Sequence, residues 1–291
     1  MEIRRFINKI ILKTIPLPFL ENFKICLKNF EKHPPILIHQ MGKVGSTTVY
    51  NSLLKLGLPN PIFHIHFISH QGIKDAEEYL KSVSKKEQHR HLIHSKILRK
   101  KMDTQKNVRW KIISLVREPI LRDISDLFQV VDRYYPQLID SNGNVDATEA
   151  ANFLEKQFDN YDESTNYTCT WFDKEIKRPF NIDVYEYPFN HEKGFTTIHK
   201  GNIDLLIMRL EDLSRCFNNA ISSFLNMHTP PLELLNSNIG KDKKYSVAYS
   251  YILQNISLPQ NTCVKIYSSK YATYFYSEEM RNRFIQKWSN T

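Results

Sequence analysis

Residues 36–50 read ILIHQMGKVGSTTVY, and this stretch decides the fold. The apolar run at its start predicts a buried strand, and the glycines on either side of Lys43 predict a tight loop. The amphipathic segment 46–56 then predicts a helix. Backbone N–H groups at a helix N-terminus, next to a lysine, form a binding site for an anion. The stretch therefore predicts a strand, a phosphate-binding loop and a helix.

The order of residues in this loop differs from the loop of ATP-binding proteins. That loop has the pattern G-x-x-x-x-G-K-[ST], in which the lysine directly follows the second glycine. Here Lys43 precedes Gly45, and no glycine stands five residues before the lysine. We therefore expect a phosphate loop that is not a Walker A loop, which argues against a small-molecule kinase.

A second strand–helix boundary lies in residues 111–125, which read KIISLVREPILRDIS. The apolar run predicts a strand that ends at Arg117, and Pro119 suits the first turn of a helix because its missing N–H costs little there. Ser125 lies two helical turns further along. In a parallel sheet the end of this strand lies beside the first loop, so we expect Arg117 to bind a ligand rather than to form a surface salt bridge.

Together the two segments resemble sulfotransferases that use PAPS (3′-phosphoadenosine-5′-phosphosulfate). The loop is similar to their 5′-phosphosulfate loop, Lys-x-Gly-[Ser/Thr]-[Ser/Thr]. The second segment is similar to their 3′-phosphate segment, Arg-x-Pro-x-x-Arg with a serine eight residues after the first arginine. Four further segments resemble a bacterial sulfotransferase family of capsular polysaccharide synthesis proteins. They are residues 172–176, 182–185, 206–213 and 267–277. The likeness covers roughly residues 35–288.

The resemblance implies a site for PAPS, with PAP as the product and no metal. It implies these cofactor-binding residues: Lys43, Val44, Gly45, Ser46, Thr47, Thr48, Arg117, Ser125, Lys243 and Tyr245. Lys43 is also expected to be catalytic, because it would reach the bridging oxygen of the donor. Segment 238–245 is similar to the late sulfotransferase loop that covers the nucleotide. An exposed helix start is an equal alternative for that segment.

A hydroxyl acceptor needs a general base, and histidine is the usual base near neutral pH. Residues 61–67 alternate between apolar and polar and predict a strand in which His64 and His66 share one face. The pair resembles the His-x-His segment of uronosyl 2-O-sulfotransferases, where the second histidine is the base. His66 is therefore the expected base, with His64 as its support or replacement. Structural histidines are the alternative, and Glu175 or Asp173 would then be the next candidates.

Alternating strands and helices predict an α/β fold, a parallel sheet flanked by helices on both faces. The resemblance to sulfotransferases implies that this sheet is of the P-loop type. The strands are expected at residues 35–40, 61–66, 109–116 and 203–209. Residues 182–188 and 194–199 are expected to form a β-hairpin. Helices are expected over residues 72–106, 119–132, 149–177, 211–226, 243–254 and 277–288. Residues 1–34 are interpreted as a basic, amphipathic extension, and residues 35–291 as the sulfotransferase-like domain.

Composition limits the class of protein. The 291 residues carry a net charge of +9, which favours an anionic partner. The 41% of hydrophobic residues excludes a disordered chain. The four cysteines form no C-x-x-C pair, which argues against a zinc or redox motif. No run of about eighteen apolar residues is present, so we expect no membrane-spanning helix and a cytoplasmic protein. The extension is expected to pack on its own domain, with peripheral membrane contact as the second interpretation.

These features predict an enzyme that moves a sulfuryl group from PAPS to a hydroxyl, on a saccharide or polysaccharide acceptor. The alternative is a non-catalytic sulfotransferase-like domain that binds an acidic glycan or a nucleotide. No RNA-binding signature is present, so no nucleic-acid partner is expected.

The basic stretch Lys85–Lys101 is interpreted as a solvated helix face, with a surface for an acidic substrate as the alternative. Trp171 and Phe172 are interpreted as core residues, with stacking on a sugar as the alternative.

Overall fold

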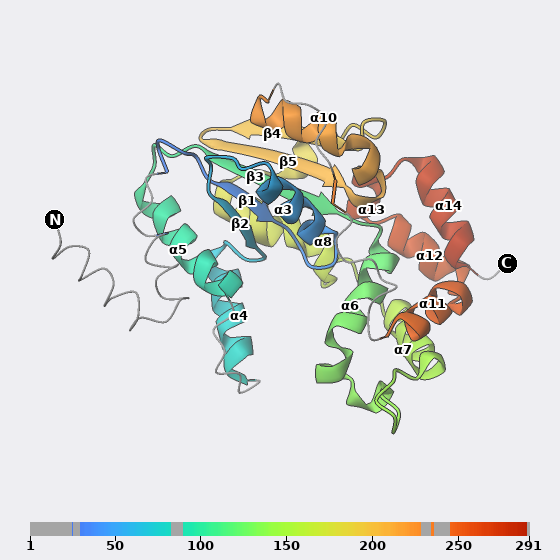
Figure 1. Cartoon of the computed structure of the whole chain (residues 1–291). Helices are drawn as coiled ribbons and strands as arrows, with labels where there is room; N and C mark the ends of the chain where they lie inside the picture. Colours follow the sequence, from blue (N-terminus) through green and yellow to red (C-terminus); the bar gives the residue numbers. More distant parts are fainter. Residues whose placement is uncertain (1–24, 26–29, 83–89, 228–233, 236–244, 290–291) are drawn as a thin grey trace.

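The computed structural model describes residue 25 and residues 30–82, 90–227, 234–235 and 245–289, and its centre is a five-stranded sheet (Figure 1). The strand order is β2-β1-β3-β5-β4. The strands are β1 (Ile36–His39), β2 (Ile62–Ile65), β3 (Trp110–Val116), β4 (Phe195–Lys200) and β5 (Ile203–Arg209). All neighbouring pairs are parallel except β4 and β5, which are antiparallel. The α/β class and the four predicted parallel strands are confirmed.

The predicted β-hairpin is wrong, because β4 pairs with β5 through a two-residue turn at Gly201. Residues 182–188 contain only a 3₁₀ turn, Val184–Glu186. The Asp183 side chain accepts a hydrogen bond from the Tyr185 N–H and so begins this turn. The Tyr274 hydroxyl contacts the carbonyl oxygens of Val184 and Tyr187 at 2.6 and 2.7 Å. The Tyr274 hydroxyl thus donates to backbone carbonyls of this segment that would accept hydrogen bonds from a neighbouring strand in a hairpin.

Helices cover both faces of the sheet, which explains why the central strands are mostly apolar on both faces. Figure 1 shows α3 (Ser46–Lys55) in front of the sheet and the yellow α8 (Tyr167–Phe172) behind it. On that rear face the rings of His39 and Trp171 lie 5.0 Å apart. Trp171 and Phe172 are each 1% exposed, so both are core residues and neither stacks on a sugar.

The remaining long helices overlap the predicted ranges, and two short helices near the C-terminus are additional. Their bounds are α4 His70–Ser82, α5 Arg90–Thr104, α6 Pro119–Tyr134, α7 Ala147–Asp159, α9 Arg178–Phe180, α10 Leu213–Leu225, α11 Ser246–Asn255, α12 Gln260–Tyr267, α13 Lys270–Phe275 and α14 Glu278–Trp288. Predicted helix 149–177 is divided into α7, α8 and a π-helical turn, Asp173–Lys177. Helices α12 and α13 were not predicted, because each is too short to show a clear apolar period.

The described end of the N-terminal extension packs against the domain. Ile25 and Phe30 are buried, and the Phe30 ring lies edge-on to the rings of Phe63 and Trp110. Most of predicted segment 1–34 lies outside the described residues. Within the part of the chain that the structure describes, no helix is both long and apolar enough to cross a membrane.

Candidate functional site

The carboxyl ends of the parallel strands open onto a cavity of about 810 Å³. The residues that directly follow β2, β3 and β5 are His66, Arg117 and Leu210, and all three line this cavity. The chain leaves β1 toward β2 on one side and returns to β3 on the other. The carboxyl ends of strands at such a switch point are the usual place for a ligand in an open α/β sheet.

The predicted phosphate loop forms one wall of the cavity. Gly42, Lys43, Gly45, Ser46, Thr47 and Thr48 all line it. Gly45 is the N-cap of α3, has φ +80° and supplies no side-chain cap to the helix. A Cβ atom on Gly45 would lie 2.5 Å from Leu210 Cδ1, so only glycine fits this turn without strain. The N–H groups at the start of α3 are thus placed for an anionic ligand.

Arg117 and Ser125 lie next to this loop. The Arg117 guanidinium donates to Ser125 Oγ at 2.8 Å and to the Lys43 carbonyl at 3.0 Å. The Tyr249 hydroxyl lies 3.0 Å from Ser125 Oγ. These partners of the guanidinium are neutral, and within the described part of the chain Arg117 forms no surface salt bridge, which was the alternative. Behind the strand end, the Tyr271 hydroxyl accepts from the Arg117 N–H at 3.1 Å and donates to its carbonyl at 2.9 Å.

Two glutamates, the buried Glu118 and its neighbour Glu211, fix the backbone from which α6 starts. Glu118 caps α6, because its carboxylate accepts from the N–H groups of Ile120 and Leu121, both at 2.8 Å. Burial raises the pKa of Glu118 to about 7. The Glu211 carboxylate in turn accepts from the Glu118 N–H at 2.8 Å. This contact gives Glu211 a structural role, because it helps to position Ser125 on α6.

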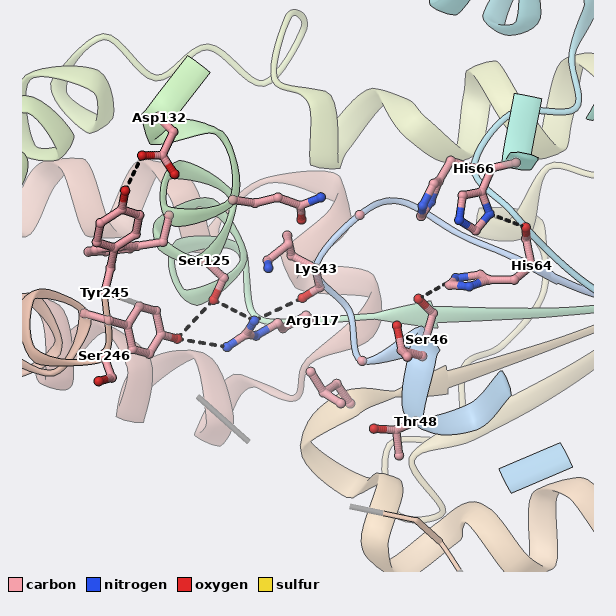
Figure 2. Close-up of a pocket in the computed structure, with 18 residues that line it drawn as sticks. Lys43, Ser46, Thr48, His64, His66, Arg117, Ser125, Asp132, Tyr245 and Ser246 are labelled. Carbon is pink, nitrogen blue, oxygen red and sulfur yellow. Dashed lines mark hydrogen bonds between the residues drawn. The ribbon is translucent and has the colours of Figure 1, made fainter. Parts of the chain in front are cut away.

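Figure 2 shows His64 and His66 at the end of the cavity away from Ser125. His91 also lines the cavity, and its ring lies 5.1 and 5.4 Å from theirs. His64 Nε2 lies 2.9 Å from Ser46 Oγ, and the ring of His64 stacks on that of Tyr50. Burial lowers the pKa of His64 to about 3. The ring beside the start of α3 is therefore that of His64 and not that of the expected base, His66. His64 is still within β2, next to β1, whereas His66 follows the end of the strand.

His66 has a defined orientation. Its Nδ1 atom lies 3.1 Å from the Gln40 carbonyl oxygen. Because a carbonyl only accepts, Nδ1 carries the hydrogen, and the neutral ring has its lone pair at Nε2. Burial also lowers the pKa of His66, which keeps the ring neutral near pH 7. A neutral imidazole with an oriented lone pair is suited to accept a proton.

The remaining predicted cofactor-binding residues are Val44, Lys243 and Tyr245, and they do not share one position. Val44 is fully buried in the core and does not line the cavity. Tyr245 lines it, and its hydroxyl donates to the Asp132 carboxylate. Lys243 and most of segment 238–245 lie outside the described residues, as does part of the basic stretch Lys85–Lys101.

Glu175, an alternative candidate for the base, is a structural cap. Its carboxylate accepts from the N–H groups of Ile68 and Ser69 at 2.7 and 3.0 Å and from Ser69 Oγ at 2.7 Å. A Cβ atom on Gly72 would lie 1.9 Å from Glu175 Oε1, which explains the glycine in the first turn of α4. Neither Glu175 nor Asp173 is among the cavity-lining residues.

The sequence did not identify several cavity residues: His91, Phe128, Gln129, Asp132, Leu210, Ser246 and Tyr249. A periodic signal was present for some of them. Phe128 and Asp132 follow Ser125 at helical spacing on α6, and Tyr249 follows Tyr245 by one turn on α11. Among the described residues, no group of three or more His, Cys, Asp or Glu side chains could hold a metal ion.

The buried His39 should make the free energy of unfolding depend on pH. Burial lowers its pKa to about 4, whereas the unfolded value is 6.5. Between these values the unfolded chain binds a proton that the native state does not, so stability falls as the pH falls. We expect a loss of up to about 1.4 kcal/mol per pH unit from this proton. Urea unfolding at pH 7 and pH 5 measures it.

A His39→Gln variant is the control for this effect. Its stability should change less between pH 7 and pH 5 than that of the wild type, even where its stability at pH 7 is lower. An equal pH dependence in the two proteins would contradict the assignment of the effect to His39.

Comparisons with known proteins identify the family. Residues 127–277 match the family model described as "Putative capsular polysaccharide synthesis protein". The comparisons with curated proteins and with solved structures gave no match. The matched segment includes Asp132, Tyr245 and Tyr249 of the cavity wall, and the phosphate loop and Arg117 precede it. Because the match covers more than half of the chain, the protein belongs to this family of capsular polysaccharide synthesis proteins.

Proposed function

We propose that the protein transfers a sulfuryl group from PAPS to a hydroxyl of a saccharide acceptor in capsular polysaccharide synthesis. One observation carries the proposal. A single cavity contains a helix start beside Lys43, an arginine–serine pair next to that loop, and the oriented lone pair of His66 at the opposite end. Two anion-binding groups and a base are what this reaction needs.

The two phosphate-bearing parts of PAPS have separate partners in this proposal. The N–H groups at the start of α3, with Lys43, would hold the 5′-phosphosulfate. Arg117 and the Ser125 hydroxyl would hold the 3′-phosphate, because a guanidinium offers a two-pronged fork to such a group. Figure 2 shows Lys43 between Ser125 and Ser46, so both groups can be reached from one bound nucleotide.

The chemistry then follows from this placement. The acceptor oxygen attacks the sulfur in line and forms the new S–O bond, while its proton moves to His66 Nε2. The bond between sulfur and the 5′-phosphate oxygen breaks, and the electron pair stays on that oxygen of PAP. Lys43 stabilises the negative charge that develops there. Such transfers depend on positioning and positive charge rather than on a covalent enzyme intermediate.

Two measurements test the proposal. PAP should raise the melting temperature, by an amount equivalent to about 2.7 kcal/mol at a hundredfold excess over Kd, while ATP and heparin should not. The protein should also move labelled sulfate from PAPS to glycans. PAP binding without any transfer would support the alternative of a non-catalytic domain. Stabilisation by ATP alone would support another nucleotide-dependent enzyme, and stabilisation by heparin alone a glycan-binding protein.

Replacing Arg117 with alanine should weaken PAP binding. A charged hydrogen bond contributes about 1.5–3 kcal/mol, so the Kd for PAP should rise by about 10- to 150-fold. Arg117→Lys keeps the charge but loses the fork, and we expect a smaller rise. Calorimetric titration with PAP measures both variants. Wild-type affinity in Arg117→Ala would end the claim that this side chain holds the 3′-phosphate.

A further inference from the structure

The third histidine of the cavity, His91, belongs to none of the motifs above. It lies in the first turn of α5 and lines the same cavity as His64 and His66. Its ring centre is 5.1 Å from that of His64 and 5.4 Å from that of His66. The connection between β2 and β3 therefore brings a histidine to the end of the cavity that is opposite to Ser125.

The backbone fixes the tautomer of His91. Its Nδ1 atom lies 2.6 Å from the carbonyl oxygen of His64. A carbonyl oxygen only accepts, so Nδ1 carries the hydrogen and the neutral ring has its lone pair at Nε2. His66 has the same arrangement on the Gln40 carbonyl. Two neighbouring imidazoles thus have hydrogen-bond acceptors where a substrate would supply donors.

The third ring has a different role. His64 Nε2 lies 2.9 Å from Ser46 Oγ and 3.0 Å from the Gln40 side-chain nitrogen. His64 is thus bonded to the phosphate-loop side of the cavity, which leaves His66 and His91 as the pair that faces an acceptor. Hydroxyls are the donors that a saccharide offers, and hydrogen bonds of about 2.8 Å from two adjacent hydroxyls are compatible with rings at this separation.

We infer that His91 binds a second hydroxyl of the acceptor, next to the hydroxyl that His66 deprotonates, and so selects saccharides with neighbouring free hydroxyls. The inference rests on the proposed sulfuryl transfer. It assigns the two histidines separate tasks: His66 accepts the proton, and His91 orients the sugar. Loss of His91 should therefore affect acceptor binding, whereas loss of His66 should affect turnover.

The test is steady-state kinetics of the full chain with PAPS and p-nitrophenyl pyranosides of glucose, galactose and glucuronic acid. Each acceptor is paired with counterparts that lack one ring hydroxyl. His91→Ala should raise the KM for the acceptor by about 10-fold, the effect of one lost hydrogen bond, with little change in kcat or in PAP binding. His91→Gln, which keeps an acceptor atom near Nε2, should restore part of the KM. His91→Asn, which is too short, should not.

The deoxy acceptors give the second readout. Removing the neighbouring hydroxyl should raise the KM of the wild type as much as His91→Ala does, and the two changes together should add little more. Lys100→Ala, exposed on the same helix, is the control and should behave as wild type. An unchanged KM in His91→Ala, or a fall in kcat with unchanged KM, would overturn the inference while sulfuryl transfer stands. No transfer by the wild type to any of these acceptors would overturn both.

Discussion

Replacing His66 with alanine should lower turnover by about 10²–10⁴-fold while PAP binding stays close to that of the wild type. The reason is a division of tasks along the cavity. In the proposed reaction Lys43, Arg117 and the N–H groups of α3 bind the phosphates, whereas His66, at the other end of the cavity, accepts the proton at Nε2. Single-turnover transfer from PAPS, measured beside calorimetric titration with PAP, separates the two effects.

His64→Ala is the matched control, because His64 lines the same end of the cavity but is bonded to Ser46. We expect it to disturb the start of α3 and to weaken PAP binding more than His66→Ala does. If His64→Ala abolishes turnover and His66→Ala does not, the two assignments exchange. If neither matters, the base is another group. The lowered pKa of His66 also predicts that turnover falls at a lower pH than it would with an ordinary histidine as the base.

The central strands could be predicted from the sequence because buried strands consist of runs of apolar residues. β5 is buried along its whole length, and it appears in the sequence as an unbroken apolar run after Asp204. The edge of the sheet could not be predicted in the same way. Segment 182–187 alternates like a strand, but its carbonyls are bonded to the Tyr274 hydroxyl, nearly ninety residues away in the sequence. Local patterning has no information about such a partner.

The same distinction applies to the site. Arg117 and His66 follow strands directly, and Lys43 lies in the loop between β1 and α3, so the topology of a parallel sheet is sufficient to place them at one edge. His91 is on a helix in the long connection between β2 and β3, and Tyr249 is on a helix after the last strand. Only the packing of those helices brings them to the cavity. A basic helix was correctly predicted around His91, but its charges alone favoured a solvated face.

Replacing Lys43 with alanine should lower kcat by about 10²–10³-fold, with a smaller effect on PAP binding. The lysine is proposed to stabilise charge that exists mainly in the transition state, on the oxygen that leaves the sulfur. The substitution should leave the loop intact. Lys43 has φ +70°, a backbone conformation that is as unfavourable for alanine as for lysine. Its partner Arg117 donates to the Lys43 backbone carbonyl, which the substitution keeps.

Two further variants of Lys43 separate charge from shape. Lys43→Met keeps most of the side-chain volume without the charge, so it should be as inactive as Lys43→Ala. Lys43→Arg keeps the charge in a different geometry and should retain part of the activity. PAP titration of each variant checks that the nucleotide site persists. Equal losses of kcat and PAP affinity in Lys43→Met would instead assign the lysine to ground-state binding, because the interaction would then be as strong before the transition state as in it.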